Sequence, residues 1–153
     1  GTENSPKKRW PVGHWRDLIH QLPGERFRIF GTHRDVKICA DVARGFPREQ
    51  IENRAGHTDI AEFAQELGEC RLLISNDTGG MHLANALGVP VIVIFGPTNP
   101  IRTGPIFEAP RILLQPPGCP AIGSALIDVV SVEQVLQALS GQSFRDRNPD
   151  RHP

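Results

Sequence analysis

The chain has 153 residues, enough for one domain with a buried core. Its 17 basic and 17 acidic side chains cancel, so the charge gives no reason to expect binding to nucleic acid or to acidic membranes. Three widely spaced cysteines exclude a complete disulfide framework and a CxxC metal pair. No apolar run reaches the ~18 residues of a membrane span, and no signal peptide is visible. We expect a cytosolic protein with reduced thiols.

Helical and strand patterns alternate along the chain. Strands are expected at 26–30, 71–75, 89–95 and 111–115, with a weaker candidate at 50–54. Helices are expected over 11–22, from 36 to Gly45, over 60–67 with Thr58 as its cap, over 83–87 ending at Gly88, and after a capping box at 131–134. The alternation predicts an α/β fold with a doubly wound, mostly parallel sheet of five or more strands. The domain is expected to cover 1–141, followed by a disordered polar tail at 142–153.

Ligands of such sheets bind beyond the carboxyl ends of the strands, so the loops after Phe30, Ser75 and Phe95 should share one functional edge. The loop after Ser75 is the most informative. Four main-chain N–H groups at its helix start, those of Thr78, Gly79, Gly80 and Met81, are expected to be unpaired and to favour an anion. The glycines would let a phosphate reach the backbone. A plain capped helix is an equally good interpretation.

Four charged or titratable side chains, three in these loops and one in the opening segment, are candidates for ligand contacts. Asp77 either caps the helix or accepts hydrogen bonds from sugar hydroxyls, and His82, one turn in, is placed to donate to a phosphate or sugar oxygen. Lys8 is suited to a diphosphate, although a solvated basic tail is the commoner use of such a cluster. Asp35 either accepts ribose hydroxyls or is an ordinary acid at a helix N-terminus.

Several common site motifs are missing from the sequence. It has no Asp-x-Asp pair for a metal-bound diphosphate, no phosphate-binding Walker loop and no GxSxG nucleophile motif. The remaining histidines show no ligand spacing. We therefore expect neither a metal nor a cofactor.

Several short motifs, taken together, resemble the ADP-heptose:lipopolysaccharide heptosyltransferase family, which is glycosyltransferase family 9. The resemblance covers about residues 1–140. The matching elements are Gly1-x-Glu3, Lys8-Arg-Trp-Pro11, His14-Trp15, Phe30-Gly31 with Asp35, Ala55-Gly56-x-Thr58, Asn76-Asp-Thr-Gly79-x-Met-His82, Ala86-Leu-Gly-Val-Pro90, Phe95-Gly-Pro-Thr98 with Pro100, and Thr103-Gly-Pro105. Two regions depart from the family: Gly80 stands where proline is usual, and 115–128 match poorly.

The resemblance implies the C-terminal, donor-binding half of a two-domain transferase of the GT-B arrangement. Lys8 and the backbone of Thr78, Gly79 and Gly80 would then contact the diphosphate, and Asp77 and His82 the heptose or phosphate. Asp35 would contact the adenosine ribose, with His57 and Thr58 as backbone neighbours of adenine. The family inverts the sugar's anomeric centre, and its catalytic base belongs to the N-terminal domain.

The implied partners are an ADP-sugar, that N-terminal acceptor-binding domain and a lipid-linked saccharide. The chain alone is expected to be inactive and to meet membranes only peripherally, at the inner face of the bacterial inner membrane. Two other hypotheses remain open from the residues: a non-catalytic nucleotide-sugar module, and a doubly wound phosphate-binding domain unrelated to sugars.

Overall fold

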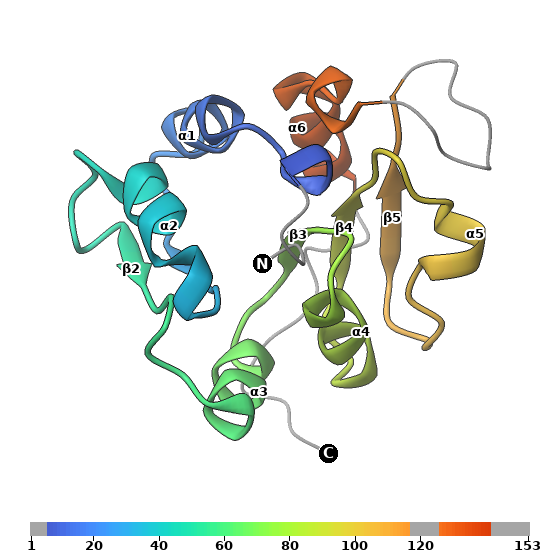
Figure 1. Cartoon of the computed structure of the whole chain (residues 1–153), viewed down its shortest axis with the longest axis horizontal. Coiled ribbons are helices and arrows are strands. Elements are labelled where there is room, and N and C mark those ends of the chain that lie inside the picture. The colour runs from blue at the N-terminus through green and yellow to red at the C-terminus, as the bar shows by residue number, and fades with distance from the viewer. Residues whose placement is uncertain (1–5, 117–125, 142–153) are drawn as a thin grey trace.

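The computed structural model describes residues 6–116 and 126–141. Strands and helices alternate within these ranges (Figure 1). The elements are η1 (Pro6–Lys8), α1 (Val12–His20), β1 (Phe27–Ile29), η2 (His33–Asp35), α2 (Val36–Ala43), β2 (Ile51–Asn53), α3 (Ile60–Gly68), β3 (Leu73–Asn76), α4 (Gly79–Ala86), β4 (Val91–Ile94), α5 (Pro100–Thr103), β5 (Arg111–Leu114), η3 (Ile127–Val129) and α6 (Val132–Ser140). The predicted tail and Cys119 lie outside the described residues.

All strand pairs of the described chain are parallel, but the strands form two sheets. β1 pairs with β2, and β4 lies between β3 and β5. The expectation of one sheet with five or more strands was therefore wrong in its pairing, although all five strands are present. The two sheets are separate because β1 and β3 lie on opposite sides of a cavity and do not exchange hydrogen bonds.

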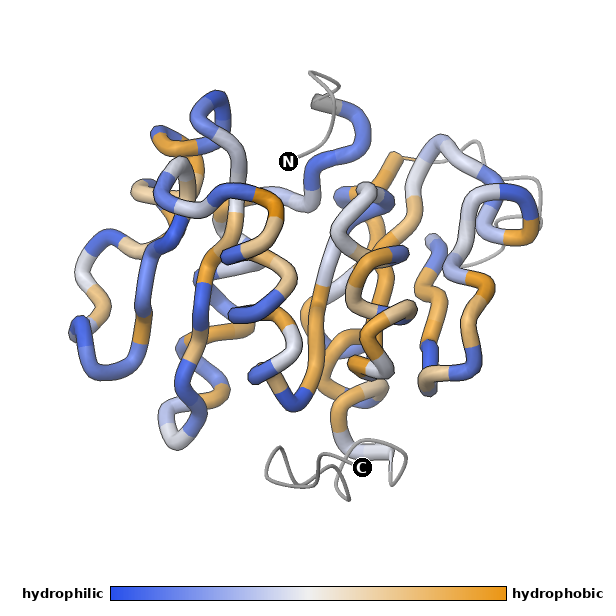
Figure 2. The backbone as a smooth tube through the Cα atoms, turned by 90° about the horizontal axis from the view of Figure 1, so that it is seen from below, coloured by the Kyte–Doolittle hydropathy of each residue, from blue (hydrophilic) through white to orange (hydrophobic). Residues whose placement is uncertain are grey.

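Helices cover both faces of the three-stranded sheet. Alternate strand residues point to opposite faces: Ile94 packs with α1 and α6, whereas Val91 and Val93 pack with α3 and α4. Every residue of β4 is fully buried, which explains its unbroken Val-Ile-Val-Ile sequence. Hydrophobic segments gather in the interior and hydrophilic ones follow the outer turns (Figure 2). The doubly wound α/β class is confirmed.

Helix ends follow local chemistry closely. Ser131 and Gln134 form the predicted capping box, with the Gln134 N–H donating to Ser131 Oγ at 3.3 Å. The cap of α3 is Asp59, whose carboxylate accepts from two main-chain N–H groups at 2.8 Å. Thr58 was thus the wrong cap, because a carboxylate one residue later competes for the same donors. Gly88 ends α4 with a φ of 73°, as predicted.

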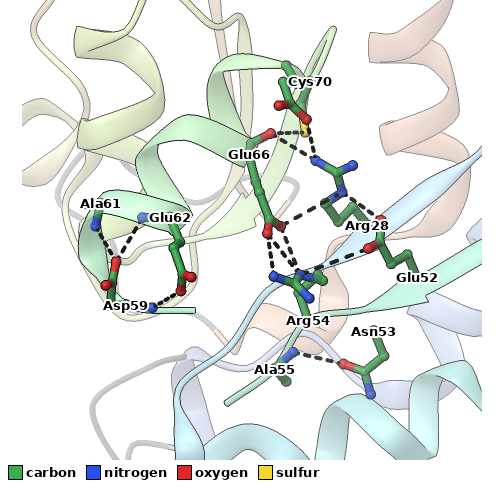
Figure 3. Close-up of polar contacts among 11 residues, drawn as sticks. Arg28, Glu52, Asn53, Arg54, Ala55, Asp59, Ala61, Glu62, Glu66 and Cys70 are labelled. Carbon is green, nitrogen blue, oxygen red and sulfur yellow. Dashed lines mark hydrogen bonds and ion pairs between the residues drawn. The ribbon is translucent and has the colours of Figure 1, made fainter. Parts of the chain in front are cut away.

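An arginine cluster ties β1 and β2 to α3 (Figure 3). Arg54 Nε donates to both carboxylate oxygens of Glu66, at 2.9 and 3.0 Å. Arg28 donates to Glu52 Oε2 at 2.9 Å and to Glu69 Oε2 at 3.0 Å. The hydrogen bonds that Arg28 donates to Glu69 and Glu52 outweigh partial burial and raise the pKa of Arg28. The cluster therefore links the two-stranded sheet to the helix that leads into β3.

Candidate functional site

Residues directly after η1 join the loops that follow β1 and β3. The Trp10 N–H donates to Asn76 Oδ1 at 3.1 Å, and Arg9 Nη2 lies 3.5 Å from Asp35 Oδ1. Trp10 is fixed in the core, where its indole donates to the Val130 carbonyl at 2.7 Å. Because neighbouring residues contact both loops, the loops lie at the same edge. The parallel pairing of β3 with β4 adds the loop after Phe95, which confirms the shared edge.

The first turn of α4 is open to solvent at Gly79. Its N-cap is Thr78, and no side chain caps the helix there. The Met81 N–H donates to the Thr78 carbonyl at 3.2 Å, so it is not one of the free donors that the sequence predicted. A Cβ added at Gly79 would meet nothing within 4 Å. The N–H groups ahead of Met81 therefore open onto a surface that a ligand can approach closely.

Lys8 and Asp77 form a pair beside this turn. Lys8 Nζ lies 3.5 Å from Asp77 Oδ2, and the two side chains are 24% and 10% exposed. Asp77 does not cap α4, which removes the first of its two predicted roles. The structural reason is that Asp77 precedes the N-cap residue Thr78. The amine of Lys8 is thus held at the helix start by a carboxylate that an incoming anion would compete with.

Asp35 is buried and already satisfied by protein groups. Its Oδ2 accepts from the Thr32 N–H at 2.9 Å and from the Thr32 hydroxyl at 2.7 Å, while Arg9 lies against Oδ1. Burial alone would raise the pKa of Asp35, but the hydrogen bonds from Thr32 and the charge of Arg9 bring this pKa below its ordinary value. The carboxylate therefore shapes the loop after β1 and holds Arg9 at the edge.

The other predicted residues divide into two groups. One cavity between the two sheets is lined by five of them: Asp35, Thr58, Thr78, Gly79 and Gly80. The lining does not include the other four, which are Lys8, His57, Asp77 and His82. His57 is exposed and His82 is half-buried. The structure thus unites the β1 and β3 loops around the cavity, with the Lys8–Asp77 pair at its side.

Sequence reasoning overlooked Arg9, Thr32 and Asn76 as organisers of the site. The signal for Thr32 was its spacing of three from Asp35, a capping pattern in the loop after β1. Asn76 ends β3, where a short amide can accept from a neighbouring backbone. The contacts of Arg9 and Asn76 join segments 26 and 66 residues apart, so local pattern could not reveal them.

The loop after β4 is shaped by close packing. A Cβ at Gly96 would lie 2.7 Å from Ile127 Cβ and 2.9 Å from the Ile127 backbone nitrogen. The hydroxyl of Thr98 is buried and finds no hydrogen-bond partner among the described residues. Asn99 caps α5 by accepting from the Ile101 N–H at 2.9 Å. Glycine at 96 thus lets this loop pass against η3.

Among the residues that the structure describes, no three His, Cys, Asp or Glu side chains gather as a metal site would require. Cys39 is a buried thiol, and burial raises its pKa. None of the described helices combines the length and apolar character needed to cross a membrane.

The fold and its loops define a Rossmann-like α/β domain, in which a helix N-terminus opens at the carboxyl edge of parallel strands. Comparison with known proteins places it more narrowly. The model of glycosyltransferase family 9 (heptosyltransferase) matches residues 1–121, and the chain belongs to that family.

Curated relatives and solved structures agree with this assignment. Lipooligosaccharide heptosyltransferase 2 of Haemophilus influenzae is 33% identical over 118 residues, which are 74% of this chain and 34% of the relative. The structure of Escherichia coli ADP-heptose lipopolysaccharide heptosyltransferase II is 27% identical, with a TM-score of 0.79 over 91% of this chain and 43% of that one. An Escherichia coli heptosyltransferase with ADP is 26% identical, with a TM-score of 0.77 over 90% and 41%. The chain spans about a third of the length of the curated relatives it matches.

Proposed function

We propose that this chain is the donor-binding half of an inverting glycosyltransferase, which moves a heptose or related sugar from an ADP-sugar to a lipopolysaccharide-type acceptor. Family membership, the heptosyltransferase names of the relatives and the ADP in one similar structure support the proposal. The observation that carries it is the open first turn of α4 with the Lys8 amine beside it. These are the groups that a diphosphate needs in the absence of a metal.

The diphosphate is the leaving group of such a transfer, and negative charge grows on it as the sugar bond breaks. N–H groups at the start of α4 and the charge of Lys8 would stabilise that growing charge. Asp77 holds Lys8 in the free protein. On donor binding we propose that Lys8 turns to the phosphates, which leaves Asp77 to accept hydrogen bonds from sugar hydroxyls, with His82 next along the helix.

The adenosine is proposed to lie toward the loop after β1. Arg9 and Thr32 are the polar groups that Asp35 positions there. Since Asp35 is only 3% exposed, its own contact with a ribose would require Arg9 to move aside. His57 and Thr58 begin the turn ahead of α3, and their backbone is the proposed neighbour of adenine.

The catalytic base is proposed to come from an N-terminal acceptor-binding domain, because Asp35 and Asp77 lie where the donor is proposed to be held. That domain and a lipid-linked saccharide are the proposed partners. The corresponding location is the cytoplasmic face of the bacterial inner membrane, with peripheral attachment only.

Isothermal calorimetry with ADP, UDP, GDP and ADP-heptose tests the proposal. We expect ADP and ADP-heptose to bind, with UDP and GDP at least about tenfold weaker, which is about 1.4 kcal/mol. Equal affinity for all three nucleotides would favour a general phosphate-binding domain instead. Sugar transfer by the chain when it is mixed with a separately purified acceptor domain would distinguish the enzyme from a non-catalytic module.

A further inference from the structure

Thr78 stands at the start of a helix without capping it. It is the N-cap residue of α4 and has the extended backbone angles that suit this position (φ −145°, ψ 164°), yet its side chain accepts no hydrogen bond from the helix. A threonine at an N-cap ordinarily accepts from the second or third N–H group of the helix, and here those groups belong to Gly80 and Met81. The Thr78 hydroxyl therefore departs from the usual behaviour of its residue type.

Three other helices of the described chain begin with a polar side chain that does act as a cap. Asp59, Asn99 and Ser131 each accept a hydrogen bond from a main-chain N–H group of the helix that follows. Thr78 belongs to the same class of short side chains with an oxygen acceptor. The missing cap on α4 consequently needs a local cause.

The hydroxyl of Ser75, at the end of β3, supplies that cause. Ser75 Oγ lies 2.7 Å from the Asn76 carbonyl oxygen and 3.2 Å from Thr78 Oγ1. A carbonyl oxygen can only accept, so the single hydroxyl proton of Ser75 is donated to Asn76. Thr78 must then donate its own proton to Ser75 Oγ. This bond holds the Thr78 hydroxyl toward β3 and out of the capping position.

We propose that Ser75 is a positioning residue: by engaging the Thr78 hydroxyl, it keeps the first turn of α4 uncapped, so that the N–H groups there can bind the diphosphate. The inference rests on the proposed function, because it takes the diphosphate to lie at this turn. A capped turn would present an N–H group that is already bonded and an oxygen lone pair beside it. An incoming phosphate would have to displace the hydroxyl before it could bind.

The competing capped arrangement is within reach of the same side chain. A Cβ built on Gly80 would lie 3.6 Å from Thr78 Oγ1, so the hydroxyl is already close to the second residue of the helix. Rotation about χ1 moves the oxygen between staggered positions. Without Ser75 as a partner, the hydroxyl would be able to turn to the Gly80 N–H. Ser75, Thr78 and Gly80 all line the cavity between the two sheets, which is the side from which a ligand approaches.

The test compares Ser75→Ala, Thr78→Val and the double variant with the unchanged chain. Ser75→Ala removes the hydroxyl that holds Thr78, and Thr78→Val keeps a branched side chain that has no oxygen to cap with. Calorimetry measures the affinity for ADP. Amide hydrogen exchange at Gly80, in the chain without ADP, reports the cap itself. Urea unfolding checks that each variant is folded.

We expect Ser75→Ala to weaken ADP binding by about 2- to 30-fold, the range that corresponds to the free energy of a Ser or Thr cap. Exchange of the Gly80 amide should become slower in the same variant, because the Thr78 hydroxyl now accepts from it. The double variant should regain the affinity and the exchange rate of the unchanged chain. Thr78→Val alone should leave both nearly unchanged, since the hydroxyl that it removes faces Ser75.

A loss of ADP affinity that persists in the double variant would show that Ser75 does not act through Thr78, and it would overturn the inference. Unchanged affinity and unchanged Gly80 exchange in Ser75→Ala would do the same. A large loss of affinity in Thr78→Val alone would make the hydroxyl itself a ligand contact, against the inference. If the unchanged chain does not bind ADP, the proposed function fails, whereas Gly80 exchange still decides whether Ser75 keeps α4 uncapped.

Discussion

Replacing Gly79 by alanine separates ligand contact from fold. Gly79 is the first residue of α4, and an added Cβ would meet no atom within 4 Å. The substitution should therefore leave stability unchanged or raise it by up to about 1 kcal/mol, since alanine restricts the unfolded chain more than glycine does. A diphosphate on the main chain would, however, meet the new methyl group. Loss of one N–H bond to a charged phosphate costs about 1.5–3 kcal/mol, or about 10- to 150-fold in Kd.

The matched control is Gly13→Ala, which also adds a methyl group in the first turn of a helix with nothing within 4 Å. Urea unfolding should show small stability changes for both variants, and calorimetry should show weaker ADP binding only for Gly79→Ala. Equal ADP affinity in the two variants would refute the placement of the diphosphate at α4.

Three further results are expected. Lys8→Ala should change the free energy of unfolding by no more than about 1 kcal/mol but weaken ADP binding about 10- to 150-fold. Asp77→Asn should weaken the binding of ADP-heptose and leave the binding of ADP equal or tighter. Equal losses of affinity for both ligands in Asp77→Asn would contradict the sugar contact. Because the folded-state pKa of Asp35 is lowered, the stability that this carboxylate contributes is complete above the unfolded value of 3.8 and is lost as the pH falls through the folded value. Between pH 7 and pH 3, the urea midpoint should therefore fall less in Asp35→Asn than in the unchanged chain. Parallel pH profiles of the two proteins would disprove this. Gly96→Ala should destabilise by about 1–3 kcal/mol, because its Cβ would overlap Ile127, and an unchanged melting temperature would show that this approach is not tight.

Local patterns predicted the elements well where a single physical cause decided them. The buried Val91–Ile94 strand, the Ser131 capping box and the glycine at the end of α4 all depend on neighbours in sequence. The prediction that Thr58 caps α3 was wrong because Thr58 and Asp59 are both good capping residues. Asp59 takes the position because its negative charge is favoured at a helix N-terminus. The apolar pattern at 83–87 covered only the later part of α4, since glycines give a weak helical signal, whereas the glycine-rich loop correctly indicated a helix start near Gly79.

Pairing between distant segments was beyond such patterns. Apolar runs indicate strands but not which edges meet, so the separation of β1 from β3 could not be foreseen. The Lys8–Asp77 pair likewise joins residues far apart in the chain. Lys8 is held by a carboxylate in the free protein, and Asp77 anchors it instead of capping the helix.

The central claim is that an ADP diphosphate binds at the start of α4, and amide chemical shifts during an ADP titration test it most directly. The account predicts the largest shifts at Thr78, Gly79 and Gly80, with smaller ones at Gly31 and Thr32 across the same edge. Shifts confined to other surfaces, or none at saturating ADP, would contradict it.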